Sequence, residues 1–158
     1  MKDAIIVRMI IEVHNAEQTR RLGARIGASL NGGEVFELVG DVGAGKTTFT
    51  KGLAQGLGIS DEVQSPSFTI SRVYDGRDNL QLVHYDFYRL SDPGIMASEV
   101  SEMVQDATTI TVIEWADIVE GILPQTHYRI LFTSPSEIER NIDVPEELKD
   151  IVNKEDAR

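Results

Sequence analysis

The fold of this chain is decided by residues 40–47, which read Gly40-Asp41-Val42-Gly43-Ala44-Gly45-Lys46-Thr47. This stretch fits the eight-residue pattern of a phosphate-binding loop, in which glycines allow backbone N–H groups to surround phosphate oxygens. The pattern ends on a lysine that can reach the β and γ phosphates and a threonine whose hydroxyl can bind Mg²⁺. It therefore predicts a magnesium-dependent nucleoside-triphosphate site.

The residues on both sides of the loop give it the context that a phosphate site needs. Residues 34–39 are typical of a strand, and helical spacing begins at Lys46 and continues until Gly56 and Gly58. In this order the positive end of the helix dipole points at the bound anion. A glycine-rich turn without a ligand is the alternative. A dinucleotide-binding fingerprint does not fit, because the glycine spacing differs.

The rest of the chain alternates between strand and helix patterns. Asn15 and Gln18 form a capping box at the start of a helix that we expect to end near residue 30. A further helix is predicted over residues 95–105. Strands are predicted over residues 10–13, 68–74, 80–86, 108–113, 128–133 and 138–144, with a hairpin turn at 75–79.

These patterns predict an α/β fold with three layers, that of the P-loop NTPases, around a mixed, mostly parallel sheet. We expect one ATPase domain over residues 1–144 and a polar, frayed tail over residues 145–158.

The composition of the chain argues against several classes of function. Fifteen basic against 26 acidic residues give a net charge of −11, which argues against tight, independent binding of nucleic acid. There is no cysteine, and the three histidines are scattered, so a structural zinc site is not expected. No apolar run approaches the roughly 18 residues of a membrane span. We expect a cytoplasmic protein that is a monomer on its own.

Two predicted strands end on a carboxylate. Asp86 follows Val83-His84-Tyr85, and Glu114 follows Thr111-Val112-Ile113. Carboxylates at strand ends beside a phosphate loop hold Mg²⁺ or its waters and orient the attacking water, so we predict that both are catalytic. The alternatives are a turn residue for Asp86, a structural role for His84 and a core position for Trp115.

The segment Ser65-Pro66-Ser67-Phe68-Thr69 lies between the helix after the loop and the hairpin. Its hydroxyls could sense the γ phosphate or bind Mg²⁺. A plain turn leading into a strand is the alternative.

Four motifs in order resemble the TsaE family of bacterial ATPases, which act in the synthesis of threonylcarbamoyladenosine at position 37 of transfer RNA. They are Gly40 to Thr48, Ser65 to Thr69, His84 to Leu90, and Ile113-Glu114-Trp115. The resemblance spans residues 15–124. It implies an enzyme that hydrolyses ATP, slowly when alone, and acts on the TsaD and TsaB complex to permit repeated turnover.

The resemblance also implies roles for individual residues. Residues 40–48 would bind ATP, with Lys46 on the phosphates and Thr47 and Glu114 on Mg²⁺. Asp86 would be an essential carboxylate, and Trp115 would lie beside the nucleotide. The adenine would lie near Asn15 and Thr19 at the first helix and Arg140 late in the chain.

Two segments depart from the family's pattern. Ser67 stands where threonine is usual, which keeps the hydroxyl. Residues 93–98 lack the acidic, leucine-bearing stretch and later glycine of the family, so the resemblance implies no partner contact for this segment.

Three other functions fit parts of the sequence. Asn153-Lys154-Glu155-Asp156 matches the guanine-reading pattern of GTPases, although it follows no buried strand. A small-molecule kinase would need a lid with several arginines, and residues 95–105 contain none. A nucleotide-gated adaptor with negligible hydrolysis is the third alternative.

Overall fold

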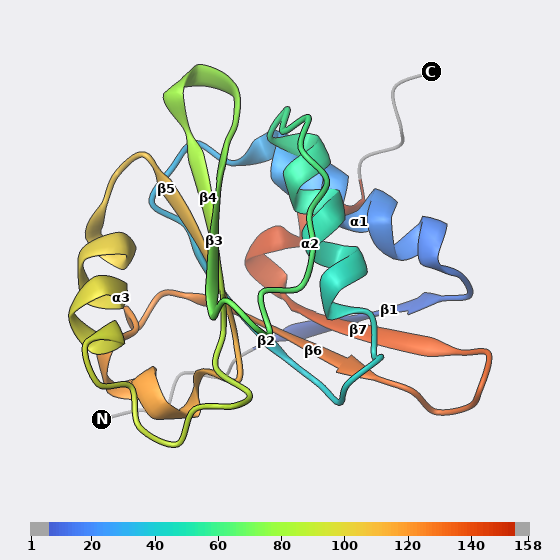
Figure 1. Cartoon of the computed structure of the whole chain (residues 1–158). Coiled ribbons are helices and arrows are strands. Elements are labelled where there is room, and N and C mark those ends of the chain that lie inside the picture. The colour runs from blue at the N-terminus through green and yellow to red at the C-terminus, as the bar shows by residue number, and fades with distance from the viewer. Residues whose placement is uncertain (1–6, 154–158) are drawn as a thin grey trace.

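The structure is a computed structural model that describes residues 7–153 (Figure 1). Its strands are Arg8–Val13 (β1), Val35–Val39 (β2), Ser71–Asp75 (β3), Gln81–Asp86 (β4), Thr109–Glu114 (β5), Tyr128–Thr133 (β6) and Arg140–Pro145 (β7). The α-helices are Ala16–Ser29 (α1), Lys46–Gly56 (α2), Met96–Gln105 (α3) and Lys149–Val152 (α4). Short 3-10 helices span Arg77–Asn79 (η1), Ala116–Ile122 (η2) and Glu146–Leu148 (η3).

The strands form one sheet in the spatial order β1-β7-β6-β2-β5-β4-β3. The central strands β6, β2, β5 and β4 run parallel to one another. Strand β7 runs antiparallel to β6, β1 antiparallel to β7, and β3 antiparallel to β4. The sheet is therefore mixed but mostly parallel, as predicted, and the carboxyl ends of β2, β4 and β5 meet at one edge.

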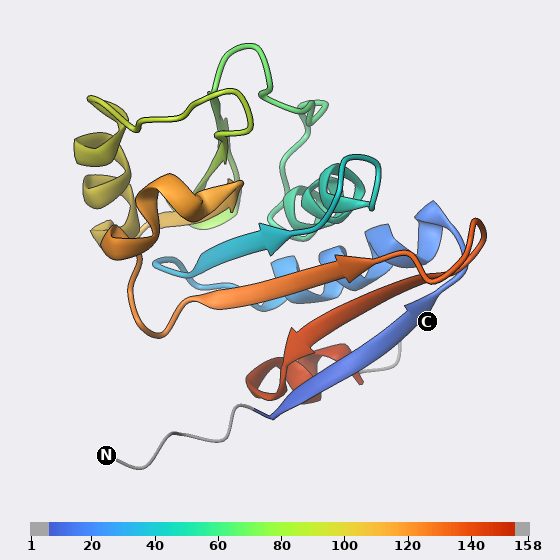
Figure 2. The ribbon, with the colours of Figure 1, turned by 90° about the horizontal axis from the view of Figure 1, so that it is seen from below.

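Helices cover both faces of the sheet. Helices α1 and α2 lie on one side of β4 and β5, and α3 lies on the other side (Figures 1 and 2). Alternate residues of the strands face the two layers, so Phe36 and Leu38 pack with α1 and α2 while Val35 packs with α3. The three-layer α/β arrangement follows from this two-sided burial.

Four glycines bring α1 and α2 into backbone contact. They are Gly23 and Gly27 in α1 and Gly52 and Gly56 in α2, each pair four residues apart. A Cβ atom on Gly52 would lie 2.2 Å from the carbonyl oxygen of Arg20. Because α2 follows the 40–45 loop directly, this contact sets the position of the loop relative to α1.

The start of α1 agrees with the predicted N-cap at Asn15, whereas the return bond of the capping box goes to His14 instead of Asn15. The side-chain oxygen Oδ1 of Asn15 accepts a hydrogen bond of 2.9 Å from the amide of Gln18. The side chain of Gln18 in turn accepts a bond of 2.8 Å from the amide of His14, one residue before the cap. The first bond satisfies an amide group that the first turn of a helix leaves unpaired, and the second ties the preceding residue to that turn.

The strand predicted over residues 68–74 is shorter than expected, because β3 begins only at Ser71. The carbonyl of Pro66 accepts hydrogen bonds from the amides of Thr69 and Ile70, at 3.1 and 2.6 Å, and so closes a turn. Ile70 has a positive φ of 70°, which is incompatible with a strand. Phe68 is left 85% exposed on this turn.

The expectation of a frayed tail is wrong for residues 145–153. Pro145 ends β7, and η3 and α4 follow it. Leu148 and Val152 lie four residues apart on one helical face and are buried in the core with α1. Residues 154–158, including most of the Asn153 to Asp156 pattern, lie outside the described residues.

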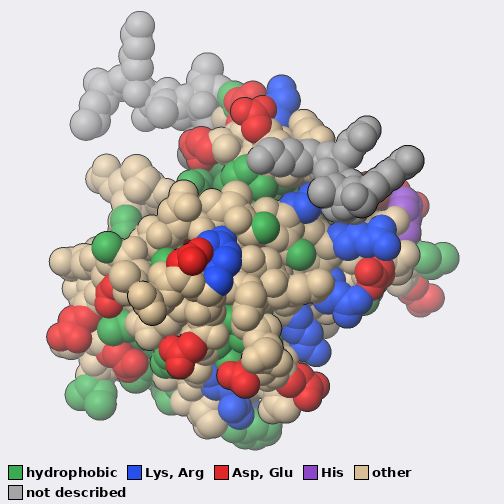
Figure 3. All heavy atoms as spheres, turned by 90° about the horizontal axis from the view of Figure 1, so that it is seen from above, with side chains coloured by type: hydrophobic (Ala, Val, Ile, Leu, Met, Phe, Trp, Pro, Cys, Tyr) green, Lys and Arg blue, Asp and Glu red, His purple; other side chains and the backbone are tan. Residues whose placement is uncertain are grey.

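Acidic side chains occur across the face seen in Figure 3, next to the basic ones. Between residues 7 and 153, no helix has both the length and the apolar character that crossing a membrane requires.

Candidate nucleotide site

The 40–45 loop connects the end of β2 to the start of α2. Gly43 and Gly45 have φ values of 82° and 107°, a region that side chains disfavour, so glycine is required at both positions. In the described part of the chain, no hydrogen bond uses the amides of Lys46, Thr47 or Thr48 as donors. These amides open α2 and, together with its dipole, are suited to an anion.

Gly40 and Asp41 shape the loop from its start. A Cβ atom on Gly40 would lie 2.7 Å from the carbonyl oxygen of Phe132 in β6, so only glycine fits there. The carbonyl of Asp41 accepts a hydrogen bond of 3.1 Å from the amide of Ala44. Val42, between them and Gly43, is 75% exposed.

The amine of Lys46 is buried and has three neighbours. It donates a hydrogen bond to the carbonyl of Gly40. Its Nζ atom lies 3.8 Å from Oε1 of Glu114 and 4.5 Å from the centroid of the Trp115 ring. The lysine therefore folds back over its own loop, between a carboxylate and an aromatic face.

The two carboxylates lie side by side. Asp86 and Glu114 are register partners in the parallel strands β4 and β5, so their side chains point to the same face of the sheet. Oδ2 of Asp86 accepts a hydrogen bond of 3.1 Å from the hydroxyl of Ser67, and Oδ1 accepts one of 3.0 Å from the amide of Tyr88. Oε2 of Glu114 is bonded to Nε2 of His84 at 2.6 Å.

A cavity of about 420 Å³ joins these groups. The predicted residues on its wall come from all four motifs, and they are Val42, Gly43, Gly45, Lys46, Thr47, Thr48, Ser65, Ser67, Asp86, Glu114 and Trp115. Segments that are far apart in the sequence thus form one wall.

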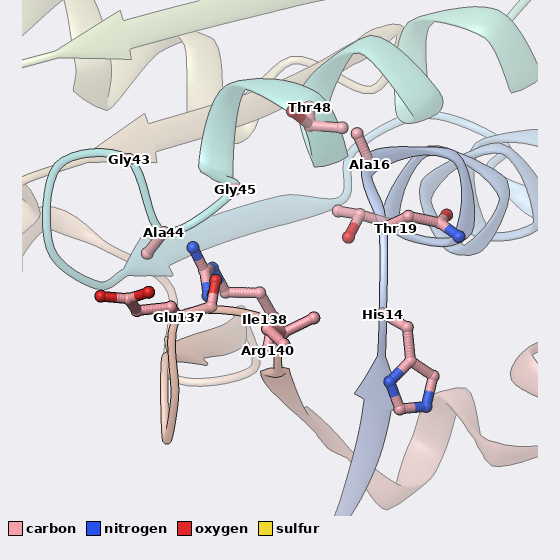
Figure 4. Close-up of a pocket in the computed structure, with 11 residues that line it drawn as sticks. His14, Ala16, Thr19, Gly43, Ala44, Gly45, Thr48, Glu137, Ile138 and Arg140 are labelled. Atoms are coloured by element: carbon pink, nitrogen blue, oxygen red, sulfur yellow. The ribbon is translucent and has the colours of Figure 1, made fainter.

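A second cavity, of about 370 Å³, lies between the loop, the start of α1 and the turn before β7 (Figure 4). Ala16 and Thr19 of α1 and Arg140 at the start of β7 border it, and Gly43, Gly45 and Thr48 border both cavities. Ala44 also lines it, as does Asn15. The loop therefore separates two spaces that an extended ligand could span.

The side chain of Arg140 makes hydrogen bonds within the turn that precedes β7. Its Nη1 atom donates hydrogen bonds to the carbonyls of Ser136, Glu137 and Glu139, at 3.0, 3.3 and 3.0 Å. These bonds hold the turn that carries Glu137 and Ile138 into the second cavity. Gly40 and Asp41 line neither of the two cavities.

Sequence reasoning missed several lining residues. Tyr88 lines the first cavity and packs against Trp115, with ring centroids 4.9 Å apart. It belongs to the His84 to Leu90 motif, so the motif could have indicated that Tyr88 lies in the site. Glu137 and Ile138 reach the second cavity from a polar turn that carries no sequence signal. Arg89 lies at the surface, with its guanidinium carbon 4.7 Å from the Phe68 ring centroid.

The donor set around Lys46 suits Mg²⁺. Thr47, Asp86 and Glu114 all offer oxygen atoms, which this ion prefers. Over residues 7–153, no group of three or more histidine or acidic side chains is placed to hold a metal by itself.

Comparisons with known proteins agree on one family. The family model described as "Threonylcarbamoyl adenosine biosynthesis protein TsaE" matches residues 13–142. A "tRNA threonylcarbamoyladenosine biosynthesis protein TsaE" from Bacillus subtilis is 40% identical over 133 residues, which cover 81% of this chain and 79% of the relative. A protein of the same description from Treponema pallidum is 42% identical over 111 residues, which cover 70% of this chain and 81% of the relative.

A solved structure shares the fold of this chain. The crystal structure of Bacillus subtilis YdiB matches with a TM-score of 0.76 and 32% sequence identity, covering 95% of this chain and 97% of that chain. The range that the family model matches contains the 40–47 loop, Asp86, Glu114 and Trp115. This chain therefore belongs to the TsaE family of threonylcarbamoyladenosine biosynthesis proteins.

Proposed function

We propose that this protein binds ATP with Mg²⁺ on a P-loop and hydrolyses it, as the ATP-driven component of threonylcarbamoyladenosine synthesis on transfer RNA. One observation carries the proposal. The buried amine of Lys46 lies between the Gly40 carbonyl, Glu114 and Trp115 at the start of α2, in a cavity that also contains Asp86. A cation beside unpaired amides and two carboxylates is the arrangement that triphosphate hydrolysis needs.

Binding uses the loop and both cavities. The amides of Lys46, Thr47 and Thr48 donate to phosphate oxygens, and the Lys46 amine turns from Glu114 towards the β and γ phosphates. The adenine occupies the second cavity, between Thr19 of α1 and Arg140. The remaining residues of the 40–48 segment shape the loop that surrounds the phosphates.

Hydrolysis uses the two adjacent carboxylates. Asp86, fixed by Ser67 and the Tyr88 amide, orients the attacking water and receives its proton. Mg²⁺, held by Thr47 and Glu114, would neutralise charge on the phosphates. Trp115 shields the amine of Lys46 from water, which strengthens its attraction for phosphate.

The partners of this reaction are TsaD and TsaB. With a net charge of −11, the protein docks on a basic face of its partners rather than on RNA. Hydrolysis is slow in isolation, and the partner complex stimulates it and is reset for another turnover.

Calorimetry with Mg²⁺ and either ATP or GTP tests the binding site. ATP should bind, and Lys46→Ala should weaken binding by about 10-fold to 100-fold, because it removes a charged hydrogen-bond donor. Lys51→Ala is the matched control, since Lys51 is exposed on the same helix. The fluorescence of Trp115, the sole tryptophan of the chain, should change on titration with ATP. A clear preference for GTP would overturn the proposal.

Phosphate release tests the enzyme. Glu114→Ala should keep ATP binding but lower turnover by about 100-fold or more. Addition of TsaD and TsaB should raise the wild-type rate, and the three proteins should co-purify in the presence of ATP in a salt-sensitive way. Unchanged threonylcarbamoyladenosine in transfer RNA after depletion of this protein would contradict the assigned process.

A further inference from the structure

A fully buried histidine contacts the candidate site from behind. His84 is 0% exposed, and its Nε2 atom lies 2.6 Å from Oε2 of Glu114. The other ring nitrogen, Nδ1, is buried and has no hydrogen-bond partner among residues 7–153. His84 thus makes one short polar contact, and that contact is to the carboxylate nearest Lys46.

The strand register explains this contact. In the parallel pair of β4 and β5, His84 lies opposite Val112 and Asp86 lies opposite Glu114. His84 and Asp86 are two residues apart, so both point to the face that α2 covers. His84 therefore lies one step below Glu114 along the sheet, on the side away from the cavity mouth.

The bond to His84 divides the two oxygens of Glu114 between two neighbours. Oε2 faces His84, and Oε1 lies 3.8 Å from the amine of Lys46. Because a carboxylate oxygen only accepts, the hydrogen of this bond is on Nε2. The orientation of the carboxylate is therefore set from below by the histidine.

A histidine at this position is costly for the fold alone. An unpaired buried polar atom such as Nδ1 costs about 1–3 kcal/mol. The neighbours Leu82, Ile110 and Val112 on the same face are apolar and buried, so an apolar side chain would suit the core better. The bond to Glu114 is the one polar contact recorded for His84 within the described chain that offsets this cost.

We propose that His84 is a positioning residue that holds Glu114 in its productive orientation. The bond keeps Oε2 in place, so that Oε1 stays directed at the cavity and the carboxylate does not close on Lys46 as a tight ion pair. This inference rests on the proposed ATP hydrolysis. His84 acts through Glu114 and does not touch the nucleotide.

Kinetics of three variants test the role of His84. His84→Leu removes the donor and should lower kcat about 10-fold to 100-fold, while the Kd for ATP changes less than about threefold. His84→Gln can donate from its amide to the same oxygen and should recover a large part of kcat. Thr111→Val is the matched control, because it removes a buried hydroxyl without a partner on β5 and should keep the wild-type kcat.

A purely structural role predicts a different pattern. The variants would then lose activity in proportion to their unfolded fraction, which denaturation curves measure, and His84→Leu would be as active per folded molecule as the wild type. That result would overturn the inference.

Nitrogen NMR of the imidazole tests the same bond without nucleotide or metal. His84 should carry its hydrogen on Nε2, and Glu114→Gln should shift the Nε2 resonance while those of His14 and His127 stay in place. A ring with its hydrogen on Nδ1 and none on Nε2 would overturn the inference, because Nε2 could then not donate to Glu114. Absence of ATP hydrolysis by the wild type and its partners would instead refute the proposed function, because the NMR result would still report on His84.

Discussion

Gly27 of α1 lies so close to Leu53 of α2 that a Cβ atom on the glycine would be 2.3 Å from the leucine carbonyl oxygen. Gly23 has the same relation to the carbonyl of Phe49, at 2.4 Å. The two helices therefore touch through their backbones, and a side chain at either position has no space. This contact places the first turn of α2, with its unpaired amides, beside Thr19 of α1.

Gly27→Ala should lower the free energy of unfolding by about 3 kcal/mol, the upper part of the range for overpacked cores. A loss of stability would be informative, because alanine in a helix is otherwise more stable than glycine by about 0.5–1 kcal/mol. Chemical denaturation measures the effect. Gly121→Ala is the control, since a Cβ atom there meets nothing within 4 Å. Equal stability of the two variants would contradict the backbone contact.

Arg77 ties the hairpin to the ends of both helices. One of its guanidinium nitrogens donates to the carbonyls of Gly27, Ala28 and Leu30, at 3.2, 3.0 and 3.0 Å, and its Nε lies 3.4 Å from the carbonyl of Gly56. The positive charge also suits the negative ends of the helix dipoles.

Arg77→Ala should therefore destabilise the protein by about 2–3 kcal/mol. Arg77→Lys should recover only part of this loss, because an ammonium group cannot reproduce the planar fork of a guanidinium. Thermal and chemical unfolding measure both variants. Arg72→Ala, in the exposed part of β3, serves as the control, and a loss as large as that of Arg77→Ala would refute a specific role for Arg77.

Ser67 couples the 65–69 segment to the candidate site through its 3.1 Å bond to Asp86. Ser67→Ala should lower the rate of ATP hydrolysis about tenfold, because a hydrogen bond to a charged group contributes about 1.5–3 kcal/mol. Ser67→Thr keeps the hydroxyl and should stay close to the wild-type rate. Phosphate-release assays compare the two. If both variants behave alike, the hydroxyl is not what matters at this position.

Glu37 of β2 and His127, just before β6, form a pH-sensitive pair. Their side chains lie 3.0 Å apart, and this hydrogen bond raises the pKa of His127 and lowers the pKa of Glu37. The charge of Arg129, 3.5 Å from Glu37, also lowers the pKa of that carboxyl, whereas burial opposes both shifts.

The raised pKa of His127 and the lowered pKa of Glu37 determine how the stability of the fold depends on pH. The His127 contribution is complete below the unfolded histidine pKa of about 6.5 and is lost as pH rises through the raised folded value. The Glu37 contribution is complete above the unfolded glutamate pKa of about 4.3 and is lost as pH falls through the lowered folded value. The pair should therefore stabilise the protein most between about pH 4.3 and pH 6.5.

Glu37→Gln tests this window. The difference in unfolding free energy between the wild type and the variant should be largest near pH 5.5 and smaller near pH 8.5. Denaturant titrations at a series of pH values measure it, with His127→Phe as the reciprocal variant. A difference that does not depend on pH would contradict the pairing.

Much of the fold was predictable because its signals are local. The glycine pattern before Lys46, the capping box at Asn15 and the alternating strand residues act through neighbours in the sequence. The predicted bounds of β6 agree with the structure, and α1, α2, α3 and β5 agree to within one or two residues. The candidate site was predictable to the level of which side chains meet, because parallel strands bring Asp86 and Glu114 to one edge. Their catalytic roles stay predictions.

The sequence by itself determined the glycine-rich loop before Lys46, the order of strands and helices and the residue types at the strand ends, since each depends on backbone preferences within a few residues. Only the tertiary structure decided that Leu148 and Val152 are buried in the core, that four glycines bring α1 into backbone contact with α2 and that His84 contacts Glu114. These contacts join residues that are distant in sequence, so their energies depend on packing that local patterns do not encode.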